Sequence, residues 1–199
     1  FISCQDPLGR DIDFNADAYV RDDGVAVLRL PRFYPFDAVL PENPTPEQYQ
    51  AFIDDFRAAV LVAFDQVKAE PLLVIDARSN FGGITQVGLD IVSGMPTAES
   101  TAISYCTSRT FGSDPPAFDD FRYAEYAVEP GGPFAYDGEV VVLVDGLDYS
   151  AADYFPYAIR KATSTPLVGS ASAGAYGGPG PLDVLEGPPE MAFNVDLDR

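Results

Sequence analysis

The chain of 199 residues contains no histidine, two cysteines and two lysines. Zinc sites in proteins are built mainly from histidine and cysteine, so the sequence implies no such metal site, and no organic cofactor is implied either. Basic residues are scarce in general: 12 Lys and Arg stand against 31 Asp and Glu, for a net charge of −19. A field of this sign repels phosphate backbones, and we therefore expect no nucleic acid among the partners.

The excess of acidic residues has two interpretations. The simpler one is a solubilising acidic surface, of the kind suited to a salty or extracytoplasmic setting. The other is calcium binding by an acidic stretch near the N-terminus, although its spacing does not match the EF-hand loop. That stretch consists of Asp11, Asp13, Asp17, Asp22 and Asp23.

Long apolar runs are also missing. None approaches about 18 residues, so the sequence predicts no membrane insertion. The chain starts at Phe1 without methionine, and we expect a mature or trimmed protein with an extracytoplasmic location, either periplasmic or secreted. The two cysteines, Cys4 and Cys106, either pair and close a loop worth ~4–5 kcal/mol or remain buried free thiols. The sequence leaves that choice and the oligomeric state open.

What is present predicts an α/β fold. Apolar runs at 25–30, 71–75, 140–144 and 167–169 predict strands, and the continuous runs 71–75 and 140–144 are typical of strands buried on both faces. Helices are expected between them, near 85–92 and 150–162, and this alternation indicates parallel strand pairing. The stretch 97–133 yields no clear elements. With no internal repeat or low-complexity linker, residues 1–199 are expected to form one domain, and an additional domain upstream is left open.

One further helix has a clear start. Thr45 is suited to cap it, Pro46 to occupy its first position, and Gln48 to complete a reciprocal capping box. Apolar residues recur at helical spacing after this start and mark the face expected to be buried. They are Phe52, Phe56, Val60, Ala63 and Val67.

Two strand-to-helix turns are the candidate site. Ligands of parallel α/β folds lie beyond the carboxyl ends of the strands, where both turns are expected. One turn holds Gly82-Gly83, whose backbone N–H groups can approach a ligand closely. The other places Ser150 at a helix start, where free N–H groups and the helix dipole favour negative charge. A nucleophile facing such donors is the arrangement that acyl transfer requires, although a serine before a helix is more often a plain N-cap.

Both turns carry motifs that resemble a known family. Asp76-x-Arg78-x-Asn80-x-Gly82-Gly83 resembles the D-x-R-x-N-x-G-G signature of the tail-specific, or C-terminal processing, serine peptidases and of their tricorn-core and retinoid-binding-protein relatives. Ser150-Ala-Ala-Asp153 resembles their S-A-x-E turn. Gly169 and Gly174 follow Ser150 by 19 and 24 residues, as in the family's closing segment.

The resemblance implies a ClpP/crotonase-like ββα superhelix core that hydrolyses peptide bonds of a peptide or protein substrate. It implies Ser150 as the nucleophile, and an oxyanion hole formed by the N–H groups of Ala151, Gly82 and Gly83. Asp153, where the family has Glu, is a further candidate, but an acid near a helix N-terminus is also stabilised by the dipole alone. Purely structural roles are open for the other motif residues: Asp76 and Arg78 can pair with each other, and Asn80 can hold its turn.

The family's general base is missing. The processing peptidases use a lysine 25 residues after the serine, and this position is Ala175. Lys161 lies eleven residues after Ser150 on the same helix, about 16 Å away, so it cannot be the partner. The tricorn-like branch uses a histidine, and the chain has none. Three explanations are open: a base from an upstream segment, a replaced lysine at position 175, or a domain that has lost catalysis.

Two rival functions follow from these gaps. The first is a catalytically inactive peptide-binding or scaffold domain of the same fold. The second is a crotonase-like acyl-CoA enzyme, which the net charge of −19 disfavours because the CoA phosphates call for basic residues. Glu186 and Glu190 are downstream candidates for the carboxylate that would orient a base, but their spacing does not single them out.

Overall fold

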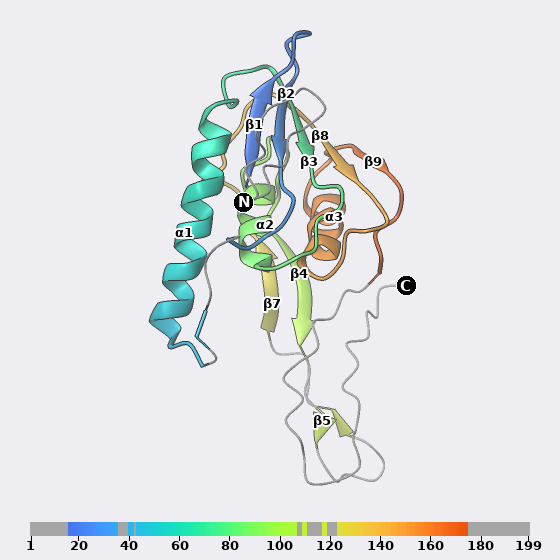
Figure 1. Cartoon of the computed structure of the whole chain (residues 1–199). Coiled ribbons are helices and arrows are strands. Elements are labelled where there is room, and N and C mark those ends of the chain that lie inside the picture. Colours follow the sequence, from blue (N-terminus) through green and yellow to red (C-terminus); the bar gives the residue numbers. More distant parts are fainter. Residues whose placement is uncertain are drawn as a thin grey trace.

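A five-stranded sheet forms the centre of the protein (Figure 1). The computed structural model describes residues 16–35, 40–41, 43–106, 109–110, 117–118 and 123–174. The strand order is β1-β2-β3-β8-β9, in which β2, β3, β8 and β9 run parallel and β1 pairs antiparallel with β2. The strands are β1 (Asp17–Val20), β2 (Ala26–Arg29), β3 (Leu72–Asp76), β8 (Glu139–Val144) and β9 (Leu167–Gly169). The predicted α/β class with mostly parallel pairing is confirmed.

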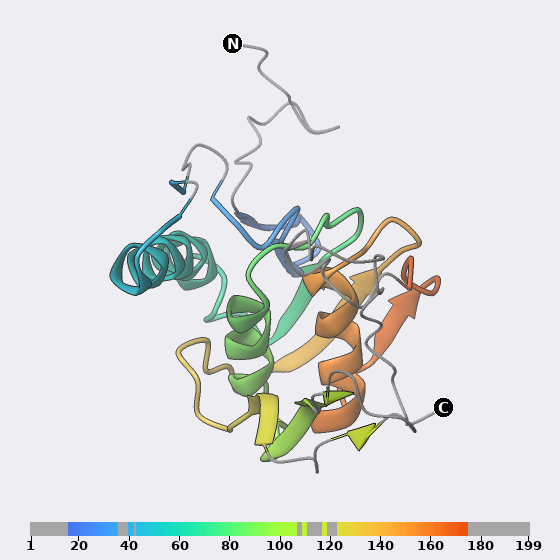
Figure 2. The same ribbon diagram turned by 90° about the horizontal axis from the view of Figure 1, so that it is seen from below.

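Three helices connect the parallel strands: α1 (Pro46–Asp65), α2 (Thr85–Ser93) and α3 (Ala151–Ala162). Figure 2 shows α2 lying between α1 and α3, with α2 and α3 packed side by side along one face of the sheet. Each of the two helices begins shortly after a parallel strand ends, α2 after β3 and α3 after β8. The expected helices near 85–92 and 150–162 are therefore present.

Helix α1 begins as its capping signals predict. The Thr45 hydroxyl accepts a hydrogen bond from the Gln48 N–H at 3.2 Å, and the Gln48 side chain accepts one from the Thr45 N–H at 2.9 Å. The buried face differs in part from the prediction: Phe52 is only partly buried, and Val67 is buried but follows the end of the helix. The buried helical residues are Ile53, Phe56, Val60, Ala63 and Phe64.

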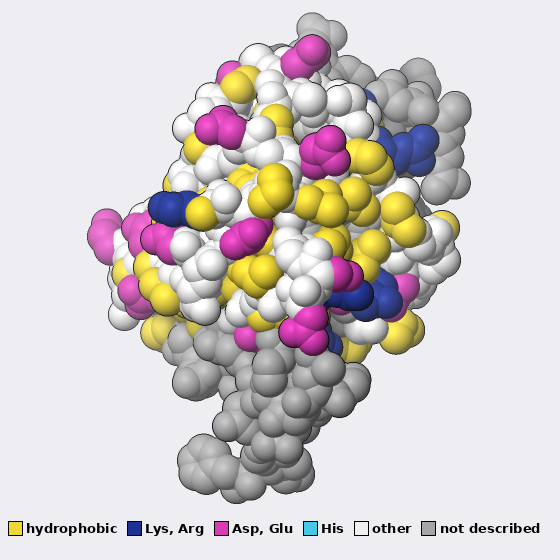
Figure 3. Space-filling model, turned by 90° about the horizontal axis from the view of Figure 1, so that it is seen from above, with side chains coloured by type: hydrophobic (Ala, Val, Ile, Leu, Met, Phe, Trp, Pro, Cys, Tyr) yellow, Lys and Arg dark blue, Asp and Glu magenta, His cyan; other side chains and the backbone are white. Residues whose placement is uncertain are grey.

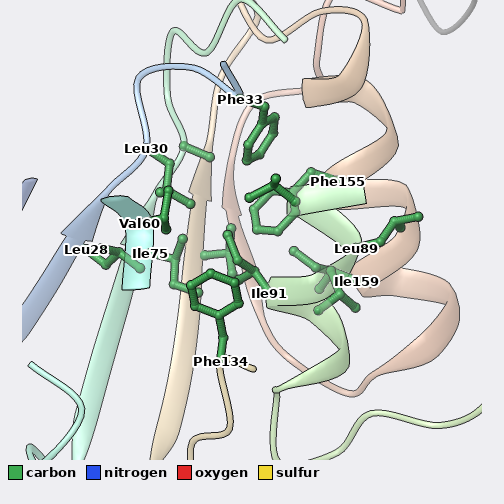
Figure 4. Close-up of a cluster of buried hydrophobic side chains, with 14 of the residues drawn as sticks. Leu28, Leu30, Phe33, Val60, Ile75, Leu89, Ile91, Phe134, Phe155 and Ile159 are labelled. Atoms are coloured by element: carbon green, nitrogen blue, oxygen red, sulfur yellow. The ribbon is translucent and has the colours of Figure 1, made fainter. Parts of the chain in front are cut away.

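The hydrophobic core lies between the sheet and the helices. Figure 4 shows side chains from β2, β3, α1, α2 and α3 converging there, with Phe33 and Phe155 in edge-to-face contact at 5.4 Å between ring centroids. Strands β3 and β8 bury alternate residues, such as Leu73 and Ile75, whereas Leu72 and Val74 are partly exposed. The expectation that both strands are buried on both faces is therefore wrong, because only one face packs against this core.

The stretch that gave no clear prediction contains two small antiparallel ribbons. One pairs β4 (Thr101–Cys106) with β7 (Tyr123–Val128), and the other pairs β5 (Arg109–Thr110) with β6 (Ala117–Phe118). The β4–β7 ribbon projects away from the central sheet (Figure 1). Cys4 and the side chain of Cys106 lie outside the described part of the chain, so the pairing of the cysteines stays a prediction.

Acidic side chains are dispersed over the face shown in Figure 3, around a central band of hydrophobic side chains. In the acidic stretch considered for calcium, Asp11 and Asp13 lie outside the described residues, and Asp23 pairs with Arg21 at 3.0 Å. Among the residues that the structure describes, no His, Cys, Asp and Glu side chains group in a way that could hold a metal ion. No helix within this same part of the chain is long and apolar enough to cross a membrane.

Candidate active site

The two turns named by the sequence meet at one edge of the sheet. Residues 77–84 follow β3 and residues 145–150 follow β8, and these strands are parallel neighbours. Gly82 has φ +80, and a Cβ added to it would lie 2.6 Å from the Tyr149 carbonyl oxygen and 2.8 Å from the Ser150 Cβ. Only a residue without a side chain permits this approach. The expectation that the Gly82-Gly83 turn faces Ser150 is confirmed.

Hydrogen bonds join the two turns directly. Ser79 donates from its backbone N–H and its hydroxyl to the Asp145 carboxylate, at 3.0 and 3.2 Å. The Asn80 N–H donates to the Asp148 carboxylate at 3.0 Å, and the Tyr149 N–H donates to the Asn80 carbonyl at 3.3 Å. Each turn therefore restrains the other, across about 66 residues of sequence.

The Asn80 side chain holds its own turn, as the structural interpretation of the motif suggested. It is fully buried, donates to the Leu30 carbonyl at 2.8 Å and accepts from the Gly82 N–H at 2.8 Å. The suggested pairing of Asp76 with Arg78 is also present, through two hydrogen bonds of 2.8 Å. The Asp76 carboxylate raises the pKa of Arg78 by this hydrogen bonding and by its charge. Both features shape the turn from within.

Ser150 has an unusual backbone conformation, with φ 58° and ψ −124°. It is the N-cap residue of α3, yet its side chain makes no capping hydrogen bond. Within the described residues its hydroxyl makes no hydrogen bond, and the residue is partly exposed. A side-chain-bearing residue in this region is strained by ~1–3 kcal/mol, and such strain concentrates at functional sites. The plain N-cap interpretation of Ser150 therefore does not hold.

Two backbone N–H groups of the two facing turns have no acceptor in the described part of the chain: that of Ala151, the first helical residue, and that of Gly83. Gly83 is fixed on both sides, because Phe33 donates to the Gly82 carbonyl at 2.8 Å and Ile84 donates to the Phe33 carbonyl at 2.6 Å. Gly82 was also expected to be an oxyanion donor, but its N–H already donates a hydrogen bond to the Asn80 side chain. Gly83 and Ala151 remain as the candidate oxyanion donors.

A third segment, 170–174, is hydrogen-bonded to the Ser150 turn and to α3. Ala173 donates to the Asp148 carbonyl at 2.8 Å, and Gly174 donates to the Asp153 carboxylate at 3.2 Å. Asp153 is buried, and its second carboxylate oxygen has no hydrogen-bond partner among the described residues. This segment leads to Ala175, the position of the family's lysine. Ala175 itself, like Glu186 and Glu190, lies outside the described part of the chain.

Neither lysine of the chain lies at the site. Lys161 is in the last turn of α3, where its ammonium group lies 5.0 Å from the centre of the Tyr157 ring. Lys68 follows α1 and pairs with Asp65 at 2.7 Å. The prediction that Lys161 is too far along its helix to serve Ser150 agrees with this placement.

Sequence reasoning missed Asp145 and Asp148. Asp148 is fully buried, and this burial raises its pKa to about 6, with the neighbouring Asp145 contributing in the same direction. The pKa of Asp145 is lowered, chiefly by the N–H of Leu147 and by Ser79. The available signal was weak: Asp145 and Asp148 lie between a buried strand and a helix start, and aspartate is common in turns because its carboxylate accepts hydrogen bonds from backbone N–H groups.

Two exposed aromatic rings border the same place. Phe81 precedes Gly82 and is 50% exposed, and Tyr149 precedes Ser150 and is 42% exposed. Their rings contact each other edge to face, at 5.9 Å between centroids. The site therefore offers apolar surface on the same two turns as the Ser150 hydroxyl and the two N–H groups that have no acceptor among the described residues.

This combination of fold and site agrees with the sequence comparison. Residues 24–195 match peptidase family S41, and the chain belongs to this family. No curated protein sequence matches the chain.

Solved peptidase structures were compared with the chain, and one of them has a similar fold with a TM-score above 0.5. A candidate peptidase from Parabacteroides merdae shares 17% sequence identity with a TM-score of 0.57, over 83% of this chain and 46% of its own. The mature form of CPAF bound to lactacystin gives 16% identity and a TM-score of 0.48, over 81% of this chain and 41% of its own. The photosystem II D1 C-terminal processing protease gives 18% identity and a TM-score of 0.42, over 73% of this chain and 31% of its own. The chain thus spans less than half the length of these proteins.

Proposed function

We propose that this protein is a serine-type endopeptidase in which Ser150 is the nucleophile. The Ser150 oxygen attacks the carbonyl carbon of a peptide bond, and its proton passes to a general base. The N–H groups of Ala151 and Gly83 stabilise the oxyanion that forms, each contributing roughly 3–4 kcal/mol to the lowering of the barrier. The carbon–nitrogen bond then breaks, the amine leaves with the proton, and water hydrolyses the ester on Ser150.

The observation that carries this proposal is the strained backbone of Ser150 between β8 and α3. Nucleophilic serines on sharp strand-to-helix turns adopt such conformations because the turn exposes the hydroxyl oxygen to the substrate. A serine that only capped a helix would direct its hydroxyl to a backbone N–H two or three residues on, which Ser150 does not do. Membership of the S41 family supports the same reaction class.

In this proposal the general base is none of the site residues described above. The chain has no histidine, residue 175 is alanine, and neither lysine lies at Ser150. A base from an additional segment of a longer protein is the explanation most compatible with a chain that spans less than half of its structural relatives. One carboxylate oxygen of Asp153 has no partner in the part of the chain that the structure describes, the other accepts from Gly174 just before Ala175, and we propose Asp153 as a supporting carboxylate.

The experiment uses the full-length protein and a fluorophosphonate probe that labels activated serines. We expect labelling of the peptide that contains Ser150, together with hydrolysis of a mixed peptide library. Ser150→Ala should abolish both and leave the protein folded. Ser164→Ala is the matched control, because Ser164 is exposed and lies beyond the end of α3. Equal hydrolysis by the Ser150→Ala variant and the unsubstituted protein would refute the proposal.

The second candidate is an inactive peptide-binding domain, favoured by the missing base and by the exposed rings of Phe81 and Tyr149. It predicts no labelling of Ser150 in the intact protein and saturable binding of peptides. The extracytoplasmic location stays a prediction, which cell fractionation tests.

A further inference from the structure

The buried carboxylate of Asp148 connects the two turns that form the site. One oxygen accepts the Asn80 N–H at 3.0 Å, and the other accepts the Asp145 N–H at 2.8 Å. The Asp148 carbonyl also accepts the Ala173 N–H at 2.8 Å. Asp148 is fully buried and lies two residues before Ser150. A single residue thus contacts the β3–α2 turn, the β8–α3 turn and the segment 170–174.

This position affects both candidate oxyanion donors. Asn80 holds Gly82 through its side chain, and Gly82 precedes Gly83, one of the donors. On the other side, Asp148 closes the turn that ends at Ser150 and Ala151, the second donor. The separation of the two N–H groups therefore depends on how the turns are joined. A displacement of about 1 Å in such a constellation can lower a rate by roughly 100-fold.

We propose that Asp148 is a positioning residue for this site: its ionised carboxylate joins the Asn80 turn to the Ser150 turn and so fixes Gly83 and Ala151 as a pair of oxyanion donors. The inference rests on the proposed function for its effect on catalysis. Its structural part, the coupling of the two turns by one charged group, holds for a peptidase and for a peptide-binding domain alike.

The ionised form is required because each oxygen must accept a hydrogen bond. Protonation turns one oxygen into an O–H donor, which is a poor partner for an N–H group. Burial raises the pKa of Asp148 to about 6, and a hydrogen bond that its protonated form donates to Asp145 adds to this shift. Asp145, whose pKa is lowered, is the charged group that faces it. The other contacts described for Asp148 are with backbone groups: its carboxylate accepts from the N–H groups of Asn80 and Asp145, its N–H donates to the Asp145 carbonyl, and its carbonyl accepts from Ala173. As the pH falls through about 6, the connection between the turns weakens.

The first test follows backbone amides by NMR in the full-length protein, and does not require activity. We expect the signals of Asn80, Gly83 and Ala151 to move with one inflection near pH 6. Asp148→Asn should remove this inflection and accelerate amide exchange at Asn80 and Tyr149 at pH 7.5. Asp22→Asn, in the exposed β1–β2 turn, is the matched control and should keep the inflection. Signals of Gly83 and Ala151 that are indifferent to pH between 5 and 7.5 would overturn the inference, even if the Asp148 variant fails to fold.

The second test measures the rate at which the fluorophosphonate probe acylates Ser150 between pH 5 and 9. The probe should acylate the Asp148→Asn variant about 10- to 100-fold more slowly at pH 8, and the inflection near pH 6 should be lost. In peptide hydrolysis by this variant, KM should change far less than kcat. An unchanged rate and pH profile would overturn the positioning role. If the NMR inflection is present but Ser150 stays unlabelled even in the unsubstituted protein, the peptidase function fails and the coupling of the turns stands.

Discussion

Replacing Gly82 by alanine tests the meeting of the two turns most directly. The added Cβ would lie 2.6 Å from the Tyr149 carbonyl oxygen, 2.8 Å from the Ser150 Cβ and 3.0 Å from the Ala151 nitrogen. Two of these three atoms belong to the backbone, so no side-chain rotation relieves the contact. The turns must separate by several tenths of an ångström or more, and Ser150 must move relative to Gly83.

The magnitude has two parts. A left-handed φ of +80° costs an L-residue roughly 1–2 kcal/mol relative to glycine. Forcing an extra methyl group into a packed contact typically costs about 1–3 kcal/mol more. Gly24 separates the two parts, because it has φ +83° and nothing within 4 Å of an added Cβ. The free energy of unfolding should therefore fall only by the conformational cost in Gly24→Ala, and by the conformational and packing costs together in Gly82→Ala.

The free energy of unfolding is measured by urea titration with tyrosine fluorescence, since the chain has 11 tyrosines and no tryptophan. We expect Gly82→Ala to be destabilised by about 1–3 kcal/mol more than Gly24→Ala. In the folded Gly82→Ala protein, acylation of Ser150 should be slower by about 100-fold, and in Gly24→Ala unchanged. Equal destabilisation of the two variants, with equal acylation, would refute the argument that Gly82 is needed for the approach of the turns.

Two further predictions concern stability. The folded-state pKa of Asp148, about 6, exceeds its ordinary value of 3.8, so its contribution to stability is present below pH 4 and is lost as the pH rises through 6. When the pH is lowered from 7 to 4, the free energy of unfolding of the unsubstituted protein should rise by up to roughly 3 kcal/mol relative to that of Asp148→Asn, as measured by urea unfolding. A difference between the two proteins that does not change with pH would contradict this. Thr45→Ala, which removes the α1 cap, should cost about 1 kcal/mol without changing Ser150 labelling, and loss of labelling would show that α1 affects the site.

Activity and stability should therefore respond to pH in opposite directions at Asp148. Ionisation stabilises the arrangement of hydrogen-bond donors around the site but places a charge in a buried position, which lowers the stability of the fold. A purely structural role would lower both together. This difference in sign is the feature that distinguishes a positioning residue from a residue that only supports the fold.

Local features of the fold could be predicted from the sequence because they depend on neighbouring residues. The start of α1 follows from Thr45, Pro46 and Gln48, which satisfy each other within one helical turn. The parallel strands β3 and β8 follow from short apolar runs. Their alternate burial could not be predicted, because it depends on which face the helices cover.

The sequence by itself predicted the two turns of the candidate site: the Gly82-Gly83 turn, and Ser150 before a helix, with Gly169 and Gly174 following Ser150 at the spacing of the family. Only the tertiary structure decided how these residues are used. It engages the Gly82 N–H with Asn80, gives those of Gly83 and Ala151 no acceptor within the described ranges, and places Asp148 between the turns. The physical reason is that these interactions join positions 66 to 68 residues apart, and a hydrogen bond at that separation depends on the packing of β3 against β8 rather than on any local pattern.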